Sequence, residues 1–92
     1  MNFISIIGLV AAFLTTGAFV PQAVKTIKTK STEDLSLATF SMMFTGTICW
    51  FTYGWLNDDL PIILANLIAS FLTGTILILK VRSIVGKKSL SN

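Results

Sequence analysis

The 92-residue chain has little charge, and this scarcity points to its class. Only 12% of its residues are charged, whereas soluble domains average about 25%. Its mean hydropathy is +0.81, so the chain lacks the polar surface that water requires around a small domain. We therefore expect a membrane protein in which lipid covers most of the outer surface.

Groups that carry chemistry are also scarce. The chain has no histidine, and Cys49 is its single cysteine, which excludes an intrachain disulfide. We find no cluster of metal ligands, no nucleophile beside a base and no glycine-rich phosphate loop, so we expect no enzyme activity, no cofactor and no metal. A soluble basic face is missing too, and nucleic acid is therefore not an expected partner.

Charge is absent from three long blocks, which cover residues 1–24, 35–57 and 60–79. A helix rises 1.5 Å per residue and needs about 20 residues to cross a hydrocarbon core of roughly 30 Å. The blocks therefore predict an all-α membrane protein, one domain of residues 1–92 with transmembrane helices at about residues 3–28, 37–56 and 60–84.

Residues between the blocks indicate where helices begin and end. Ser31 with Asp34 has the form of a capping box, and Ser36 is a second N-cap candidate. Pro61 fits the first turn of the third helix. Gly86 is typical of a helix C-cap and would end that helix near residue 84.

The seven basic residues fall into two segments. The connection between the second and third predicted helices carries only Asp58 and Asp59. Because basic loops stay in the cytoplasm, we expect the N-terminus outside and the C-terminus in the cytoplasm, with anionic lipid as a secondary contact. The basic residues are Lys25, Lys28 and Lys30 after the first helix, and Lys80, Arg82, Lys87 and Lys88 at the end of the third.

Pro21 lies inside the first predicted helix. Its ring removes one backbone hydrogen bond and crowds the carbonyl of Gly17, which the hydroxyl of Thr15 or Thr16, or water, would have to satisfy. One interpretation is a static kink in a packed bundle. The other is a hinge between a fixed outer part and a mobile cytoplasmic part, which Gly17 favours because it lowers the cost of bending.

Trp50 and Asn66 are unusual for the depth at which they lie. Counted from Asp58 and Asp59, they lie about 12 Å and about 10 Å inside the outer boundary. An indole ring can cover the apolar face of a sugar, and an amide both donates and accepts hydrogen bonds. A packed aromatic ring and an interhelical hydrogen bond are the alternative.

Residues of mixed polarity form one stripe along the second predicted helix, which includes Trp50, and one along the third, which includes Asn66. A packed interface between helices would explain these stripes as well as the lining of a pathway would. No Asp, Glu, Lys or Arg lies within a predicted span, which argues for passive transport. Three helices around their own axis leave no passage for a sugar, so we expect a parallel homodimer of six helices around one pathway. The stripes are Met43, Thr47, Trp50, Gly54 and Asn57, and Asn66, Ser70 and Thr73.

Two segments carry a resemblance to a known family. They read "FVPQAVKTIKTKSTEDLS" (residues 19–36) and "CWFTYGWLNDDLPIILAN" (residues 49–66), and with them the chain resembles SemiSWEETs, the bacterial half-size relatives of the SWEET sugar transporters within the PQ-loop group. The resemblance implies a three-helix protomer, a parallel homodimer with one central sugar pocket, and facilitated diffusion by alternating access. Trp50 and Asn66 correspond to the pocket pair, and the Pro21-Gln22 pair to the hinge.

The resemblance also implies two gates. Tyr53, Asn57 and Asp59 match an extracellular gate in which relatives often pair an arginine with the acid across the dimer. This chain has Asn57 at the arginine position, and an amide forms a weaker bond than a charge-assisted pair, so the gate would close less firmly. Candidates for the intracellular gate, chosen by depth only, are Phe19, Phe40 and Met43.

We therefore expect a dimeric uniporter for a mono- or disaccharide such as glucose or sucrose in the bacterial inner membrane. One alternative is a PQ-loop carrier of another small polar solute such as an amino acid. The other is a structural membrane subunit without cargo, in which Trp50 and Asn66 form a dry interface.

Overall fold

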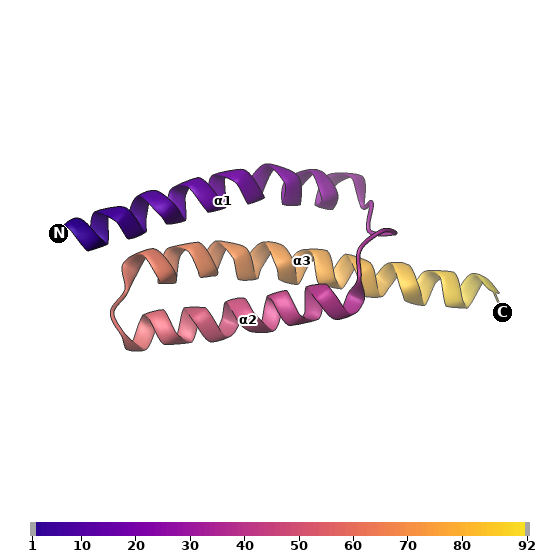
Figure 1. Ribbon diagram of the computed structural model, residues 1–92. Coiled ribbons are helices and arrows are strands. Elements are labelled where there is room, and N and C mark those ends of the chain that lie inside the picture. The colour runs from indigo at the N-terminus through magenta and orange to yellow at the C-terminus, as the bar shows by residue number, and fades with distance from the viewer. Residues whose placement is uncertain (1, 92) are drawn as a thin grey trace.

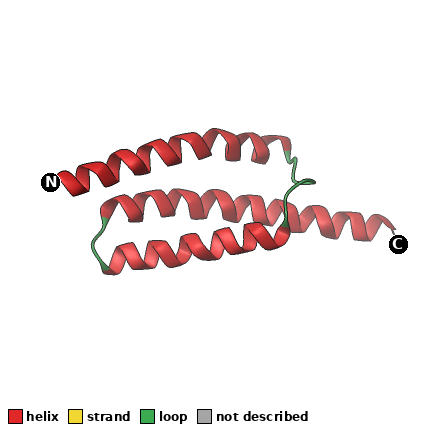
Figure 2. Cartoon of the chain, in the orientation of Figure 1, coloured by secondary structure: helices red, strands yellow, loops and turns green. Residues whose placement is uncertain are grey.

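The computed structural model describes residues 2–91, with side chains up to Lys88, and over this range the protein is all-helical. Three helices follow one another along the chain: α1 (Phe3–Thr29), α2 (Leu37–Leu56) and α3 (Leu60–Ser91). A loop of residues 30–36 joins α1 to α2, and a short turn of residues 57–59 joins α2 to α3 (Figures 1 and 2).

Helix α1 begins at a capping asparagine and runs through its proline without a break. The Asn2 side chain accepts a hydrogen bond from the Ser5 amide at 2.7 Å, and the helix ends where Lys30 adopts the left-handed conformation (φ 54°). The Thr15 hydroxyl donates to the Ala11 carbonyl at 3.0 Å. The Thr15 hydroxyl therefore does not bond the Gly17 carbonyl that Pro21 leaves free, although Thr15 was one of the expected partners.

Helix α2 begins after Ser36, whose hydroxyl accepts from the Thr39 amide at 3.2 Å. The second of the two N-cap candidates is thus the one used. At the other end the Asn57 amide donates to the Tyr53 carbonyl at 3.0 Å. Asp58 then takes a positive φ of 53°, which reverses the chain within three residues.

Helix α3 begins after Asp59, whose carboxylate accepts from the Ile62 amide at 3.3 Å. Its predicted end near residue 84 is wrong, because α3 continues through Gly86 to Ser91. No glycine among the described residues has a positive φ, so Gly86 does not form the C-cap that its position indicated. A glycine inside a helix costs only about 1 kcal/mol relative to alanine, and the lysines that follow favour helix.

The three helices form a flat layer with α3 in the middle. Both α1 and α2 pack against α3, whereas α1 and α2 do not pack against each other, and the molecule measures 59 × 24 × 14 Å. The expected arrangement around a common axis is therefore wrong. One end of the layer holds the α1–α2 loop and the other holds the α2–α3 turn with the start of α1 (Figure 1); we call them the loop end and the turn end.

The small hydrophobic core lies in the loop-end half. Ala23 of α1 packs with Leu72 and Ile76 of α3, and all three are less than a tenth exposed. Around this cluster lie the partly buried side chains of Phe19, Val20, Ile27, Leu35 and Phe40.

Within residues 2–91, two helices are long and apolar enough to cross a membrane: α1, over Phe3–Thr29, and α3, over Leu60–Lys88. Helix α2 carries no charge, but its four threonines, its serine and its tryptophan and tyrosine rings dilute the aliphatic side chains. It therefore does not reach the mean hydropathy of the other two, although three spans were expected.

Candidate functional site

The contact between Gly54 and Ile62 shows where Trp50 and Asn66 lie along the helix axes. A Cβ placed on Gly54 of α2 would lie 2.7 Å from Ile62 Cγ2 of α3, so these two helices touch there. Trp50 lies four residues before Gly54, and Asn66 lies four residues after Ile62. Because α2 and α3 run antiparallel, both steps lead about 6 Å toward the loop end, and Trp50 and Asn66 share one level.

A central hollow of about 320 Å³ extends from this level toward the loop end, between α1 and α2 over the surface of α3. Met43 lines the hollow, and Trp50 follows it by seven residues, two turns later on nearly the same line of α2. The Trp50 side chain is 55% exposed and packs edge-on against Tyr53, with ring centroids 5.5 Å apart. The Trp50 ring itself is not among the side chains that line the central hollow.

Threonines contribute polar groups to the wall of the central hollow. The Thr47 hydroxyl donates to the Phe44 carbonyl at 2.7 Å, and the Thr73 hydroxyl donates to the Ala69 carbonyl at 2.7 Å. A hydroxyl has one hydrogen to donate and two lone pairs, so the Thr47 oxygen keeps its acceptor capacity for a ligand, whereas Thr73 is only 1% exposed. The polar side chains that line the hollow are Thr15, Thr16, Thr47, Asn66 and Thr73.

Asn66 adds both kinds of hydrogen-bonding group to this wall. The half-buried side chain donates one amide N–H to the Ile62 carbonyl at 2.9 Å. An amide has two N–H groups and a carbonyl with two lone pairs. One donor and the Asn66 oxygen therefore remain for a ligand.

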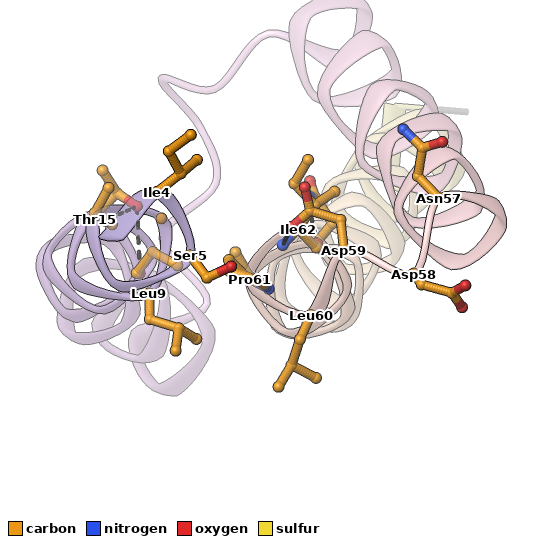
Figure 3. Close-up of a pocket in the computed structure, with 15 residues that line it drawn as sticks. Ile4, Ser5, Leu9, Thr15, Asn57, Asp58, Asp59, Leu60, Pro61 and Ile62 are labelled. Carbon is orange, nitrogen blue, oxygen red and sulfur yellow. Dashed lines mark hydrogen bonds between the residues drawn. The ribbon is translucent and has the colours of Figure 1, made fainter. Parts of the chain in front are cut away.

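A second hollow of about 600 Å³ opens at the turn end, between the start of α1 and the α2–α3 turn (Figure 3). It shares Thr15, Ala65 and Asn66 with the central hollow. The two hollows thus adjoin at the level of Asn66, and together they lead from the turn end to the middle of the protomer.

Two of the three proposed extracellular gate residues, Asn57 and Asp59, lie at this turn-end hollow, and Tyr53 is not among its lining residues. Asn57 and Asp59 project on the same side of the layer, whereas the Asp58 carboxylate points away from both (Figure 3). Tyr53, which lies one turn before Asn57, is 51% exposed. The Asp59 carboxylate already caps α3 through the Ile62 amide, so it serves the fold besides any part in a gate.

The intracellular gate candidates separate in the structure. Phe19 and Met43 line the central hollow. Phe40 packs against the core cluster instead and is not among the residues that line the hollow. Phe40 was chosen by its depth along α2, but its side chain packs against the cluster of Ala23, Leu72 and Ile76.

The Pro21-Gln22 pair lies on exposed backbone beside a third hollow. Pro21 and Gly17 line an apolar groove of about 510 Å³ between α1 and α3, and a Cβ on Gly17 would meet no atom within 4 Å. The Gln22 carbonyl accepts a hydrogen bond from the Thr26 hydroxyl at 3.1 Å. The groove therefore leaves space on one side of the bend that Pro21 would allow.

Sequence reasoning missed that Thr15 and Thr16 belong to the central hollow, although their spacing of three or four residues before Phe19 was a signal. It also placed Ser70 on the same stripe as Asn66. Ser70 does not line the central hollow, and its hydroxyl is buried without a partner among the described residues. No cluster of side chains able to hold a metal ion occurs in residues 2–91.

Comparison with known proteins identifies the family. A sequence model of the PQ loop repeat matches residues 3–63. The chain is 49% identical over 76 residues to a sugar transporter SemiSWEET from Leptospira biflexa, which covers 83% of this chain and 89% of that protein. It is 42% identical over 79 residues to a sugar transporter SemiSWEET from Escherichia coli, with 86% and 89% covered.

Solved structures agree with these sequence matches. A crystal structure of a SemiSWEET in the inward-open conformation superposes with a TM-score of 0.93 at 38% identity, covering 99% of this chain and 98% of that one. A bacterial homologue of SWEET transporters superposes with a TM-score of 0.74 at 46% identity, covering 88% and 98%. The resemblance drawn from the sequence is confirmed, and the chain belongs to the SemiSWEET group of the PQ-loop repeat family.

Proposed function

We propose that this protein is a facilitative sugar transporter that moves a mono- or disaccharide, such as glucose or sucrose, by alternating access. The observation that carries the proposal is the pair of adjoining hollows, which meet at Asn66 and lead from the turn end to a threonine-lined centre. The names of the relatives from Leptospira biflexa and Escherichia coli support sugar as the cargo.

The transporting unit is a parallel homodimer in which all three helices of each protomer cross the membrane. One protomer is a layer only 14 Å thick in its shortest dimension, so its central hollow is open on one side. A second copy inserted in the same orientation would close that side. Helix α2 then needs less apolar surface toward lipid, because the face that holds Thr47 and Trp50 would line the shared pathway.

The sugar binds between Trp50 and Asn66 of both protomers. Each sugar hydroxyl can donate to a threonine oxygen, and the free Asn66 N–H and oxygen add one donor and one acceptor. The exposed indole of Trp50 covers the apolar face of the sugar ring. No ionisable side chain lines the central hollow, which supports passive transport of a neutral solute.

Movement depends on a hinge and two gates. The Pro21-Gln22 pair is the hinge, since the groove beside Pro21 leaves room for bending. Tyr53, Asn57 and Asp59 form the extracellular gate at the turn end.

Phe19 and Met43 form the intracellular gate, because both border the central hollow on its loop side. Phe40, the third candidate, acts by packing against the core. The turn end and the N-terminus face outside and the C-terminus faces the cytoplasm of a bacterial inner membrane, because the basic residues gather at the loop end.

Uptake of labelled sugars into proteoliposomes tests the proposal. We expect flux of glucose or sucrose through the purified protein, and loss of that flux in Trp50→Ala and Asn66→Ala while the dimer stays folded. Trp55→Ala is the matched control, because the Trp55 ring stacks on Phe51 with centroids 6.1 Å apart, away from the hollow.

Three outcomes would contradict the proposal. Unchanged flux in both Trp50→Ala and Asn66→Ala would remove the binding site. Flux of labelled amino acids without flux of any sugar would identify a carrier for another solute, and no flux at all would indicate a structural subunit.

A further inference from the structure

A lysine on α3 holds the loop that joins α1 to α2. The Lys80 ammonium donates to the Thr32 carbonyl at 2.8 Å and to the Glu33 carbonyl at 3.3 Å. The hydroxyls of Thr15, Thr47 and Thr73 bond within their own helices, whereas Lys80 links two elements that lie far apart in the sequence.

This link is built into the packed part of the fold. Thr32 is only 1% exposed, and its carbonyl also accepts from the Leu35 amide at 3.1 Å. Lys80 is half-buried and follows the core residue Ile76 by four residues, which places both on one face of α3. The ammonium carries three donors and here satisfies two loop carbonyls at once.

The topology gives this link mechanical importance. Helices α1 and α2 do not pack against each other, so they are coupled only through the loop and through α3. A swing of the α1 segment after Pro21 would pull on the loop. Lys80 resists that pull, because it ties the loop to α3.

We infer that Lys80 is a positioning residue for alternating access: it pins the α1–α2 loop to α3, so that residues 22–29 of α1 move with α3 as one body. Bending at Pro21 then displaces the turn-end half of α1. This inference rests on the proposed function and reverses the division into a fixed outer part and a mobile cytoplasmic part that the sequence indicated.

Three variants separate this role from general stability. Lys80→Met removes the donors and keeps the apolar stem, whereas Lys80→Arg keeps donors at the same place. Lys87→Met is the matched control, because Lys87 is exposed and has no hydrogen-bond partner among the described residues. Amide hydrogen exchange of residues 30–36 and sugar flux in proteoliposomes are measured for each.

We expect Lys80→Met to raise amide exchange at Thr32 and Leu35 about tenfold, since a charge-assisted bond is lost. Its maximal flux changes by at least about threefold while the half-saturating sugar concentration stays constant, because the hollow is untouched. Lys80→Arg restores both quantities, and Lys87→Met changes neither.

Unchanged exchange in Lys80→Met would overturn the inference, as would equal exchange in Lys87→Met. Faster exchange with unchanged flux would also overturn it, because the link would then tie the loop without positioning α1. If the unaltered protein carried no sugar, the proposed function would fail, while the exchange data would still decide whether Lys80 holds the loop.

Discussion

The two halves of the protomer are packed to different degrees. Apart from Gly54, the buried residues of the described chain all lie in the loop-end half, around the core and the α1–α2 loop. The turn-end half instead exposes large apolar and aromatic side chains, such as Phe13, which is 77% exposed. The buried residues of the loop-end half are Ala23, Thr32, Leu72, Thr73 and Ile76.

This difference indicates which half holds the fold and which half is free to move. Segments with few buried contacts open at low free energy, whereas a packed core opens only with the whole structure. The turn-end hollow and the proposed extracellular gate lie in the loosely packed half, whereas the central hollow extends to Thr73 in the packed half. The packed contacts that stabilise the fold therefore lie mainly at the loop end, and the turn end is able to change shape.

The largest expected effect comes from the core. Ile76→Ala should lower the free energy of unfolding by about 2–4 kcal/mol, because the side chain is 2% exposed and its removal leaves a cavity. Ile4→Ala removes the same atoms from the turn-end half, where Ile4 is 78% exposed, and should cost less than about 0.5 kcal/mol. Unfolding titrations in detergent measure both, and equal losses would show that the halves do not differ.

The next effect concerns the glycine contacts between α2 and α3. Gly54→Ala should destabilise the protein by about 1–3 kcal/mol, because its Cβ would lie 2.7 Å from Ile62 Cγ2 and 3.2 Å from the Ile63 amide nitrogen, which cannot move aside. In Gly74→Ala the Cβ would meet the Phe44 ring at 2.9 Å, and a side chain can rotate. Thermal unfolding compares the two, and a greater loss in Gly74→Ala would contradict this reasoning.

Helix positions and helix starts could be predicted from the sequence, because they depend on local features. The charge-free blocks indicated α1 and α2 closely, and Ser36 is a local cap. The levels of Trp50 and Asn66 followed from counting helical rise inward from the turn. These quantities require only the period and the length of a helix.

Packing between helices was not predictable in the same way. The arrangement of the three helices in one layer depends on which helix faces meet. The contact between Gly54 and Ile62 is visible only in the folded structure. Phe40 illustrates the same limit, since depth alone did not show that its ring turns to the core. Lys80 was counted as one of several basic residues that set the topology, and nothing local indicated that its ammonium reaches the Thr32 carbonyl.

A smaller effect should arise at the hinge. Gly17→Ala meets no atom within 4 Å of its new Cβ, so it should stabilise α1 by about 0.5–1 kcal/mol through helix propensity alone. A stiffer helix before Pro21 should slow sugar flux while stability rises. Flux and thermal unfolding are measured together, and a variant that is both more stable and equally fast would argue for a static kink.

The smallest effect concerns the extracellular gate at the turn end. In the proposed homodimer, Asn57→Arg would place a cation near Asp59 of the partner protomer, and an exposed ion pair contributes about 0.2–1 kcal/mol toward the closed gate. The gate is monitored by the rate at which an impermeant thiol reagent modifies Ser5→Cys, which lines the turn-end hollow, in a Cys49→Ser background. Modification should slow in Asn57→Arg at low salt and recover at about 1 M salt, where the Debye length shrinks to about 3 Å.

Asn57→Gln controls for side-chain length without charge and should show no salt dependence. An unchanged modification rate in Asn57→Arg would mean that position 57 does not govern the closure of this gate, and that the loosely packed half closes by helix contact alone.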